Sequence, residues 1–254
     1  MLQRNFQHTK TMKTLFIGDI HGRNIWQSIT SKEQPDRVVF IGDYFDSFDI
    51  PGIEQLHNFK NIIEYKKTSG IEVIMLVGNH DYHYFPGGET YSGFQHTLRF
   101  SIYDALNENK EHLQMCYQLD NILCSHAGIG HNWLVTQTGY NPDGETSIVD
   151  HVNNLWTFKP NWFMFNGFDP YGDSKTQTPI WIRPASLMSG NKQTFLKTDY
   201  IQIAGHTGVR RIDVEGKATG GRYYFIDALE ESQYLVYEDG KFSVGVVADD
   251  KQSF

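Results

Sequence analysis

The chain has 254 residues, and its 30 acidic side chains outnumber its 22 basic ones, which gives a formal net charge of −8. This length suits one large α/β domain, while the negative charge argues against sequence-specific nucleic acid or an anionic membrane as a partner. No apolar run reaches the about 18 residues of a membrane span, and the polar N-terminus contains no signal core. Cys116 and Cys124 both lie in apolar runs, so we expect reduced thiols and a cytoplasmic protein.

Strands and helices alternate in the first third of the chain. Buried strands are expected at residues 14–17, 37–41 and 71–77, where each short apolar run is followed by a glycine. A brief helix is expected at 24–29, and apolar residues at helical spacing predict a longer one that ends near Gly70. Strand, helix and strand in this order indicate βαβ units and a largely parallel sheet.

The next elements follow a Pro-Gly-Gly turn at residues 86–88. Ser92 and Gln95 form a capping-box pattern, which predicts the start of a helix with an apolar stripe. Two strands are expected at 112–119 and 122–125, because the Asp-Asn pair between them is a hairpin signal.

Residues 131–178 differ from the rest and are expected to form an aromatic-rich insertion or lid. The segment contains one expected helix at 148–158, followed by the rings of Trp162, Phe163, Phe165, Phe168 and Tyr171. Two interpretations stay open, because such rings either stack on a nucleobase or pack in the core.

The last third returns to strand character. Strands are expected at residues 180–182, 200–204, 223–226, 234–237 and 242–247. We expect the last three to form an antiparallel meander in a second sheet that packs on the first. No repeat or linker interrupts the chain, so residues 1–254 are read as one domain, with 1–12 as a disordered tail or an upstream start.

Polar side chains that can bind a metal follow five of the apolar runs, each beside a glycine. They are Asp19, His21, Asp43, Asn79, His126 and His206. In an open α/β sheet, ligands bind at the carboxyl ends of the strands. Oxygen and imidazole donors without a thiolate suit Mn²⁺, Fe²⁺ or Zn²⁺. Six ligands are too many for one open catalytic ion, so we expect two divalent ions that share a carboxylate, with Mn²⁺ as the first choice.

These residues stand in sequence blocks that resemble the calcineurin-like metallophosphoesterase superfamily. The blocks are Gly18-Asp19-Ile20-His21-Gly22, Gly42-Asp43-Tyr44-Phe45-Asp46, Gly78-Asn79-His80-Asp81, His126 and Gly205-His206-Thr207. Ser125-His126-Ala127-Gly128 and Phe225-Ile226-Asp227 are closer to the branch of phosphoprotein phosphatases and symmetrical diadenosine-tetraphosphatases.

The resemblance implies a fold, a ligand set and an activity. The fold is a four-layer αββα sandwich of two mixed β-sheets flanked by helices, with a dinuclear metal site at one edge. Asp19, His21 and Asp43 would hold one ion, and Asp43, Asn79, His126 and His206 the other, with Asp43 as the bridge. The implied activity is hydrolysis of a phosphate ester by in-line attack of a metal-bridging hydroxide.

Two residues are predicted to handle the proton of the leaving group. His80 is adjacent to the ligand Asn79 and is placed to protonate the leaving oxygen. Asp46, three residues after the bridging Asp43, would orient that imidazole and favour its charged form. A merely structural role is the alternative for both residues.

Arg183, in the sequence Trp181-Ile182-Arg183, is the candidate phosphate clamp, because a guanidinium matches a phosphoryl group in a bidentate way. Asn79 is a second candidate for contact with substrate. Where the phosphoprotein phosphatases have Asp-Arg-Gly, this chain has Asp46-Ser47-Phe48 and lacks one expected arginine. Arg210 or Arg211 is the candidate replacement, and a solvated surface position is the alternative for all three arginines.

Three functions therefore remain in competition. The first is a phosphomonoesterase that acts on phosphoserine or phosphothreonine in proteins or on a small phosphate ester. The second is a nucleotide phosphoanhydride or phosphodiester hydrolase, with a diadenosine-tetraphosphate-like or polynucleotide-end substrate. The third is a degenerate fold that serves as a binding scaffold. His83 is the nearest to the site of the histidines without an assigned role.

Overall fold

The structure is a computed structural model that describes residues 12–166, 173–192, 194, 196 and 200–247. All but the last residue of the expected tail, and both Phe168 and Tyr171 of the aromatic segment, lie outside these residues. Cys116 and Cys124 are buried free thiols, as expected. Within the described part of the chain, no helix is long and apolar enough to cross a membrane.

The first sheet has six strands in the order β10-β9-β1-β2-β3-β4. These strands are β1 (Thr14–Ile17), β2 (Arg37–Phe40), β3 (Glu72–Leu76), β4 (Leu113–Gln114), β9 (Gln233–Glu238) and β10 (Lys241–Val246). Strands β1 to β4 are parallel, as the alternation of strands and helices predicted, and β9 and β10 add an antiparallel edge next to β1.

The second sheet has four strands in the order β5-β6-β7-β8. They are β5 (Tyr117–Leu119), β6 (Ile122–Cys124), β7 (Ile201–Ala204) and β8 (Tyr223–Phe225). The predicted hairpin is present as the antiparallel pair β5 and β6, while β7 and β8 extend the sheet in parallel.

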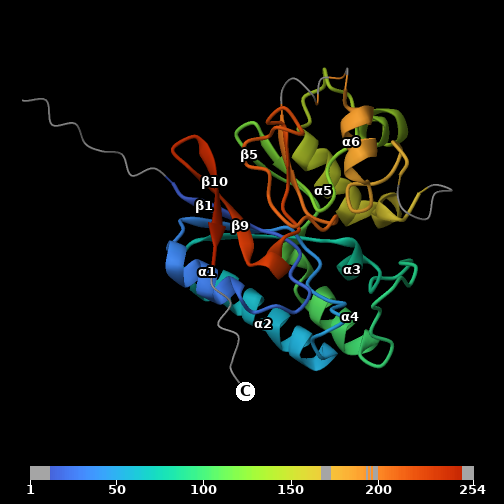
Figure 1. Ribbon diagram of the computed structural model, residues 1–254. Helices are drawn as coiled ribbons and strands as arrows, with labels where there is room; N and C mark the ends of the chain where they lie inside the picture. Colours follow the sequence, from blue (N-terminus) through green and yellow to red (C-terminus); the bar gives the residue numbers. More distant parts are fainter. Residues whose placement is uncertain (1–11, 167–172, 193, 195, 197–199, 248–254) are drawn as a thin grey trace, which may run out of the picture.

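Helices cover the outer faces of both sheets (Figure 1). Helices α1 (Trp26–Glu33), α2 (Gly52–Thr68) and α4 (Arg99–Glu108) lie against the first sheet, and α5 (Ile148–Phe158) and α6 (Pro184–Gly190) lie on the side of the second. Together with the two mixed sheets they give the predicted α/β fold with four layers. The short helix α3 (Asn79–Tyr82) follows β3 directly.

Alternation along the central strands explains the two cores. In β1, Leu15 and Ile17 belong to the core under the helices, whereas Phe16 belongs to the core between the sheets. Successive side chains of a strand point to opposite faces, so a strand buried on both faces reads as a continuous apolar run. Each such buried side chain contributes about 1.5–3 kcal/mol.

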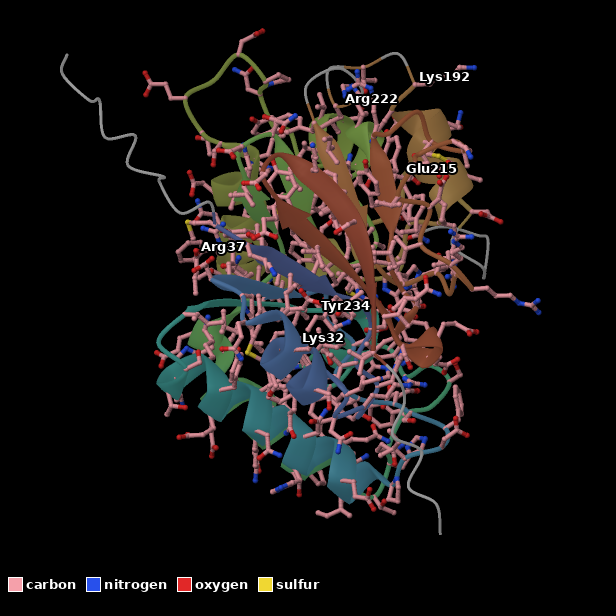
Figure 2. The ribbon with its side chains drawn as sticks, turned by 60° about the vertical axis from the view of Figure 1, so that its left-hand side comes forward. Lys32, Arg37, Lys192, Glu215, Arg222 and Tyr234 are labelled. Atoms are coloured by element: carbon pink, nitrogen blue, oxygen red, sulfur yellow. The ribbon has the colours of Figure 1, made fainter. Side chains whose placement is uncertain are left out.

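Strands β9 and β10 are also bonded to the helical layer by polar contacts. Lys32 of α1 approaches Tyr234 of β9, with Nζ 3.3 Å from the tyrosine hydroxyl (Figure 2), and it also donates to the carbonyl of Val246 in β10.

The prediction of an antiparallel meander in the second sheet is wrong in one respect. Strand β8 joins the second sheet, but β9 and β10 complete the first sheet beside β1.

Three further predicted boundaries differ from the structure. The helix expected from Ser92 begins at Arg99, because Gln95 uses its backbone N–H to bond the Tyr84 hydroxyl in a turn. The run 112–119 is divided between β4 and β5, because Asn153 of α5 accepts the N–H groups of residues 115 and 116 where the chain changes sheets.

The third difference concerns Ile180–Ile182, which was expected to be a strand. The N–H groups of Trp181 and Ile182 both bond the carbonyl of Thr178, at 3.0 and 3.1 Å, so the segment is a turn. Its apolar side chains are buried by packing against other elements and not by pairing in a sheet.

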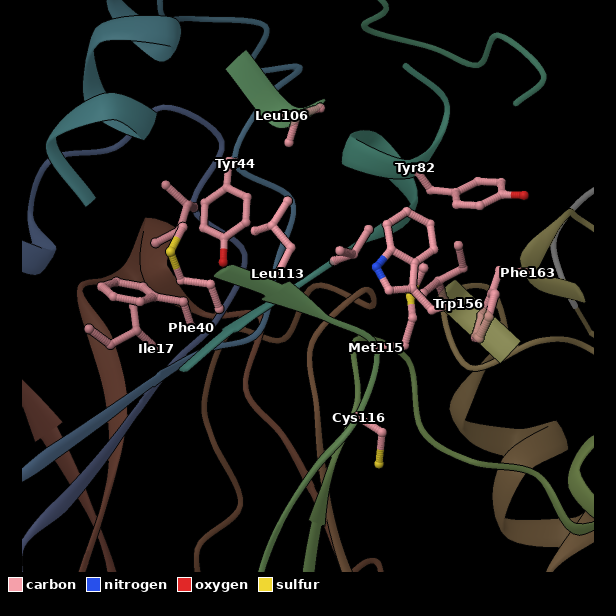
Figure 3. Close-up of a cluster of buried hydrophobic side chains, with 14 of the residues drawn as sticks. Ile17, Phe40, Tyr44, Tyr82, Leu106, Leu113, Met115, Cys116, Trp156 and Phe163 are labelled. Carbon is pink, nitrogen blue, oxygen red and sulfur yellow. The ribbon is translucent and has the colours of Figure 1, made fainter. Parts of the chain in front are cut away.

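Several rings of the aromatic segment lie in the core. Trp156 and Phe163 are 3% and 0% exposed, and Figure 3 shows them in the same buried cluster as Ile17 and Phe40. The Ser147 side chain caps the first turn of α5 by accepting the N–H of Asp150 at 3.0 Å. Of the two interpretations, core packing describes Trp156 and Phe163.

Candidate metal centre

The loops after β1 and β2 lie side by side and carry the first three candidate ligands. The N–H groups of His21 and Gly22 bond the carbonyls of Asp43 and Tyr44, at 2.6 and 3.0 Å. His21 and Asp43 have positive φ angles of 41° and 50°, a left-handed backbone that turns the chain sharply at the strand end. The parallel order of the sheet thus brings Asp19, His21 and Asp43 to one edge.

Glycines permit close approach of the carboxylates to neighbouring backbone. A Cβ atom on Gly78 would lie 2.0 Å from Oδ1 of Asp43, and one on Gly205 would lie 1.9 Å from Oδ1 of Asp19. Both distances are far below van der Waals contact, so only glycine fits at these two strand ends.

The second sheet supplies the two remaining imidazoles at the ends of β6 and β7. Nε2 of His126 lies 2.9 Å from Oδ1 of Asn79 and 3.3 Å from Oδ2 of Asp43. Nδ1 of His206 lies 2.8 Å from the same amide oxygen of Asn79. The opposite nitrogens face backbone carbonyls, those of Ile41 at 3.0 Å and of Trp181 at 3.1 Å.

These carbonyl contacts fix the tautomers, because the nitrogen that faces a carbonyl must carry the proton. His126 then presents its Nε2 lone pair to the site, and His206 presents Nδ1. His21 is held in the same way, with Nδ1 2.6 Å from the carbonyl of Phe45, and its Nε2 lies 3.8 Å from Oδ2 of Asp43.

The charges of the buried groups fit a bound cation. Donor atoms of Asp19, Asp43 and His126 all lie within 4.8 Å of one another. Burial, reinforced by Asp227 and Asp43, raises the pKa of Asp19 well above its usual range. Burial also lowers the pKa of His206, so its imidazole is neutral, as a ligand must be. Converging carboxylates and lone pairs are the donor set that a divalent ion stabilises.

His80 and Asp46 form a pair beside these donors. Nδ1 of His80 lies 2.9 Å from Oδ2 of Asp46, and the His80 backbone N–H donates to Oδ1 of Asp43 at 2.8 Å. Burial lowers the pKa of His80, but Asp43 and Asp46 outweigh it and raise the pKa to about 9. The neighbouring carboxylates thus favour the protonated imidazole, which is the form that a proton donor needs.

Asp46 has further partners that the sequence did not predict. Nε2 of His83 lies 2.6 Å from Oδ2 of Asp46, and the Tyr84 hydroxyl donates to Oδ1. Asp46 itself is 1% exposed and has a left-handed backbone with φ of 68°. His83, left without a role in the sequence analysis, packs against the carboxylate that holds His80.

Asp81 is the clearest residue that sequence reasoning missed. Its buried carboxylate accepts the N–H groups of Asp43, Tyr44 and Gly78, at 2.8, 2.7 and 2.9 Å. It therefore ties the loop after β2 to the loop after β3. The available signal was its place in the first turn of a helix capped by Gly78, where an acidic side chain satisfies unpaired N–H groups.

Arg183 lies beneath the loop after β7. Its Nη1 donates to the carbonyl of His206 at 3.0 Å and to Oγ1 of Thr207 at 3.1 Å. This contact orients the guanidinium at the edge of the site, and the role as a phosphate clamp stays a prediction.

A cleft of about 420 Å³ opens above His21, His80 and Asp46. Arg23 and Arg210 line it, together with Asp227, whose pKa burial and Asp43 raise to about 6. Arg210 was a candidate from the sequence, whereas Arg23 and Asp227 were not assigned a role there.

A comparison with protein families finds a match over most of the chain. A model of the calcineurin-like phosphoesterase family matches residues 12–228. No curated protein matches the sequence.

Solved structures share the fold at low sequence identity. The structure of a cold-active protein-tyrosine phosphatase from a psychrophile Shewanella species is similar, with a TM-score of 0.64, 16% identity, and coverage of 92% of this chain and 78% of the other. A protein serine/threonine phosphatase from Saccharomyces cerevisiae has a TM-score of 0.56 and 12% identity, with coverage of 96% and 82%. At such identities the likeness establishes the fold alone.

Proposed function

The chain belongs to the calcineurin-like phosphoesterase family and is a metal-dependent phosphatase, and from this premise we propose that it hydrolyses phosphomonoesters. The observation that carries the proposal is the imidazole of His80, which lines the same cleft as His21 beside the cluster of metal donors and has its Nδ1 2.9 Å from Oδ2 of Asp46. Hydrolysis of a monoester needs both the bound cations and a proton donor, because the charge of the phosphoryl group must be neutralised and the leaving alkoxide must be protonated.

Two divalent ions fit the donors, with Mn²⁺ as the first choice. Asp19, His21 and Asp43 would hold one, and Asp43, Asn79, His126 and His206 the other. Divalent ions bound there supply positive charge for the phosphoryl oxygens and lower the pKa of a coordinated water. The protein fixes the donors in advance, because Asp81 and the carbonyls of Ile41 and Trp181 hold them in place.

His80 supplies the proton to the leaving oxygen in this proposal. The Asp46 carboxylate holds its Nδ1, so the proton to be transferred is on Nε2. Asp46 is in turn fixed by Tyr84 and His83. After the transfer, the anion of Asp46 favours renewed protonation of His80.

Arg183 and Asn79 are proposed to orient the phosphoryl group. The anchoring of Nη1 of Arg183 on the His206 loop supports this role, because it fixes the planar guanidinium next to a proposed ligand. Arg23 and Arg210 add positive charge in the cleft.

The decisive test compares three substrates with Mn²⁺ and after its removal by chelation. We expect turnover of para-nitrophenyl phosphate, with much slower turnover of bis-para-nitrophenyl phosphate and diadenosine tetraphosphate. Preference for either of the last two would replace the monoesterase proposal with the diesterase or anhydride hydrolase. Turnover that persists without metal would contradict both.

A further inference from the structure

An exposed aromatic side chain stands at the rim of the catalytic cleft. Phe48 lies in the loop between β2 and α2, its side chain is 81% exposed, and it lines the same cleft as His80. Buried aromatic side chains remove about 150–250 Å² from water, so this ring offers a large apolar surface that a ligand can cover.

The loop that presents Phe48 is held in a fixed turn. Oγ of Ser47 accepts the N–H groups of Asp49 and Ile50, both at 3.2 Å. The fully buried side chain of Gln55 accepts the Ser47 N–H at 3.2 Å and donates to the Ile50 carbonyl at 2.6 Å. The backbone on both sides of Phe48 is therefore held by hydrogen bonds. A ligand that contacts the ring loses little affinity to the ordering of this loop.

The position of Phe48 assigns it to one side of the substrate. Asp46, two residues earlier, bonds His80, and His80 is the proposed donor to the leaving oxygen. Phe48 and His80 line the same cleft, so the alcohol part of an ester that His80 protonates extends into the cleft that Phe48 borders. This step rests on the proposed function.

Acidic side chains in the lining of the cleft disfavour additional phosphate groups. Asp49, Glu230 and Glu231 line the cleft together with Phe48, Arg23 is paired with Glu230, and Arg210 is the other arginine of the lining. Because the carboxylates of the lining outnumber its two arginines, the cleft favours an uncharged ring over a polyphosphate chain.

We propose that Phe48 forms a stacking subsite for a planar, uncharged ring in the alcohol part of a phosphomonoester. The ring belongs either to an aryl ester, where it is bonded to the ester oxygen, or to the base of a nucleoside monophosphate. Stacking on the face of Phe48 lowers KM for such esters, and small aliphatic monoesters gain nothing from it.

The test is the Phe48→Ala variant with phenyl phosphate, adenosine 5′-monophosphate and glycerol 2-phosphate in Mn²⁺. We expect KM for a ring-bearing ester to rise about three- to tenfold, with kcat changed less than about twofold. KM for glycerol 2-phosphate should stay constant. Phe48→Tyr should restore the low KM, and Phe100→Ala, which removes a 67% exposed ring on α4, should change nothing.

The pattern among substrates distinguishes the two sources of the ring. A rise confined to phenyl phosphate indicates an aryl ester, and a rise confined to the nucleotide indicates a base. Equal changes for all three substrates, or none, overturn the subsite.

A binding measurement separates failure of the subsite from failure of the proposed function. Calorimetry compares phenylphosphonate with methylphosphonate on the Mn²⁺-loaded protein, and neither ligand is hydrolysed. Weaker binding of phenylphosphonate to Phe48→Ala supports the subsite even if no monoester is turned over, in which case the monoesterase proposal fails alone. Unchanged binding of phenylphosphonate overturns the subsite.

Discussion

The floor and the rim of the cleft are built in opposite ways. On the floor, Asp19, Asp43 and Asn79 are at most 2% exposed. Backbone N–H groups bond the two carboxylates, and the imidazoles of His126 and His206 contact the Asn79 amide oxygen. On the rim, Phe48 and Asp49 are exposed, and hydrogen bonds hold only the backbone of their loop. The buried, hydrogen-bonded side chains of the floor determine the reaction, because replacement of any one of them disrupts the site. The exposed wall is free to differ between family members and to set the substrate.

Replacement of a floor residue should have the largest effect. Asp43→Asn removes the carboxylate shared by both proposed ion sites. Loss of a residue that only hydrogen-bonds a metal ligand costs up to about 100-fold in activity. Because Asp43 is itself a proposed ligand, we expect kcat/KM to fall by more than this. Bound Mn²⁺, measured by metal analysis, should fall as well. Asp104→Asn on the exposed face of α4 is the control, and full metal content in Asp43→Asn would show that the floor does not bind metal through Asp43.

His80 lies between floor and rim, so its replacement sharpens the comparison. In His80→Ala, hydrolysis of an alkyl phosphate should slow by about 10²–10⁴-fold. Para-nitrophenyl phosphate should slow much less, because its leaving group needs no proton. Metal content should stay constant. Equal metal loss in His80→Ala and Asp43→Asn would make His80 a ligand and remove its role as a donor.

Asp81 tests whether the floor depends on its supports. Asp81→Asn keeps the size but replaces one acceptor oxygen with an N–H donor, which faces the N–H groups of the two loops. We expect Mn²⁺ affinity to fall about 10–100-fold, with a lower midpoint of urea unfolding. Unchanged affinity would mean that the loops keep their geometry without this carboxylate.

The smallest expected effect is on stability against pH in the metal-free protein. The folded pKa of His80, about 9, exceeds the ordinary value of 6.5, so its contribution is complete below pH 6.5 and is lost as pH rises through 9. The loss is at most about 3 kcal/mol. Urea unfolding of wild type and His80→Asn between these pH values measures it, and parallel curves would contradict it.

The proximity of the floor side chains could be predicted from the sequence, because each of them is tied to a local signal. Asp19, Asp43 and Asn79 each follow an apolar run and a glycine, and parallel strands bring such ends together. Asp81 was missed because its partners are N–H groups of two loops, and their convergence depends on tertiary structure.

The misplaced strands have a similar cause. The pairing of β9 with β1 joins chain segments that are far apart, and a local pattern contains no information on that choice. Ile180–Ile182 was misread because burial alone makes a turn look like a strand. The exposure of Phe48 was not predicted either, because an apolar residue in a loop gives no local signal of whether it is buried or exposed.

Asp19 and His206 are 187 positions apart in the sequence, yet the His206 N–H donates to the Asp19 carboxylate. A contact of that span forms only when most of the polypeptide is already arranged, because closing so long a loop carries an entropic cost that earlier contacts must offset. A nascent chain that has left the ribosome only as far as β4 would contain four of the six proposed donors, without His126 and His206 of the second sheet. Metal loading should therefore follow folding, and the rate at which Mn²⁺ is taken up during refolding should report completion of the second sheet.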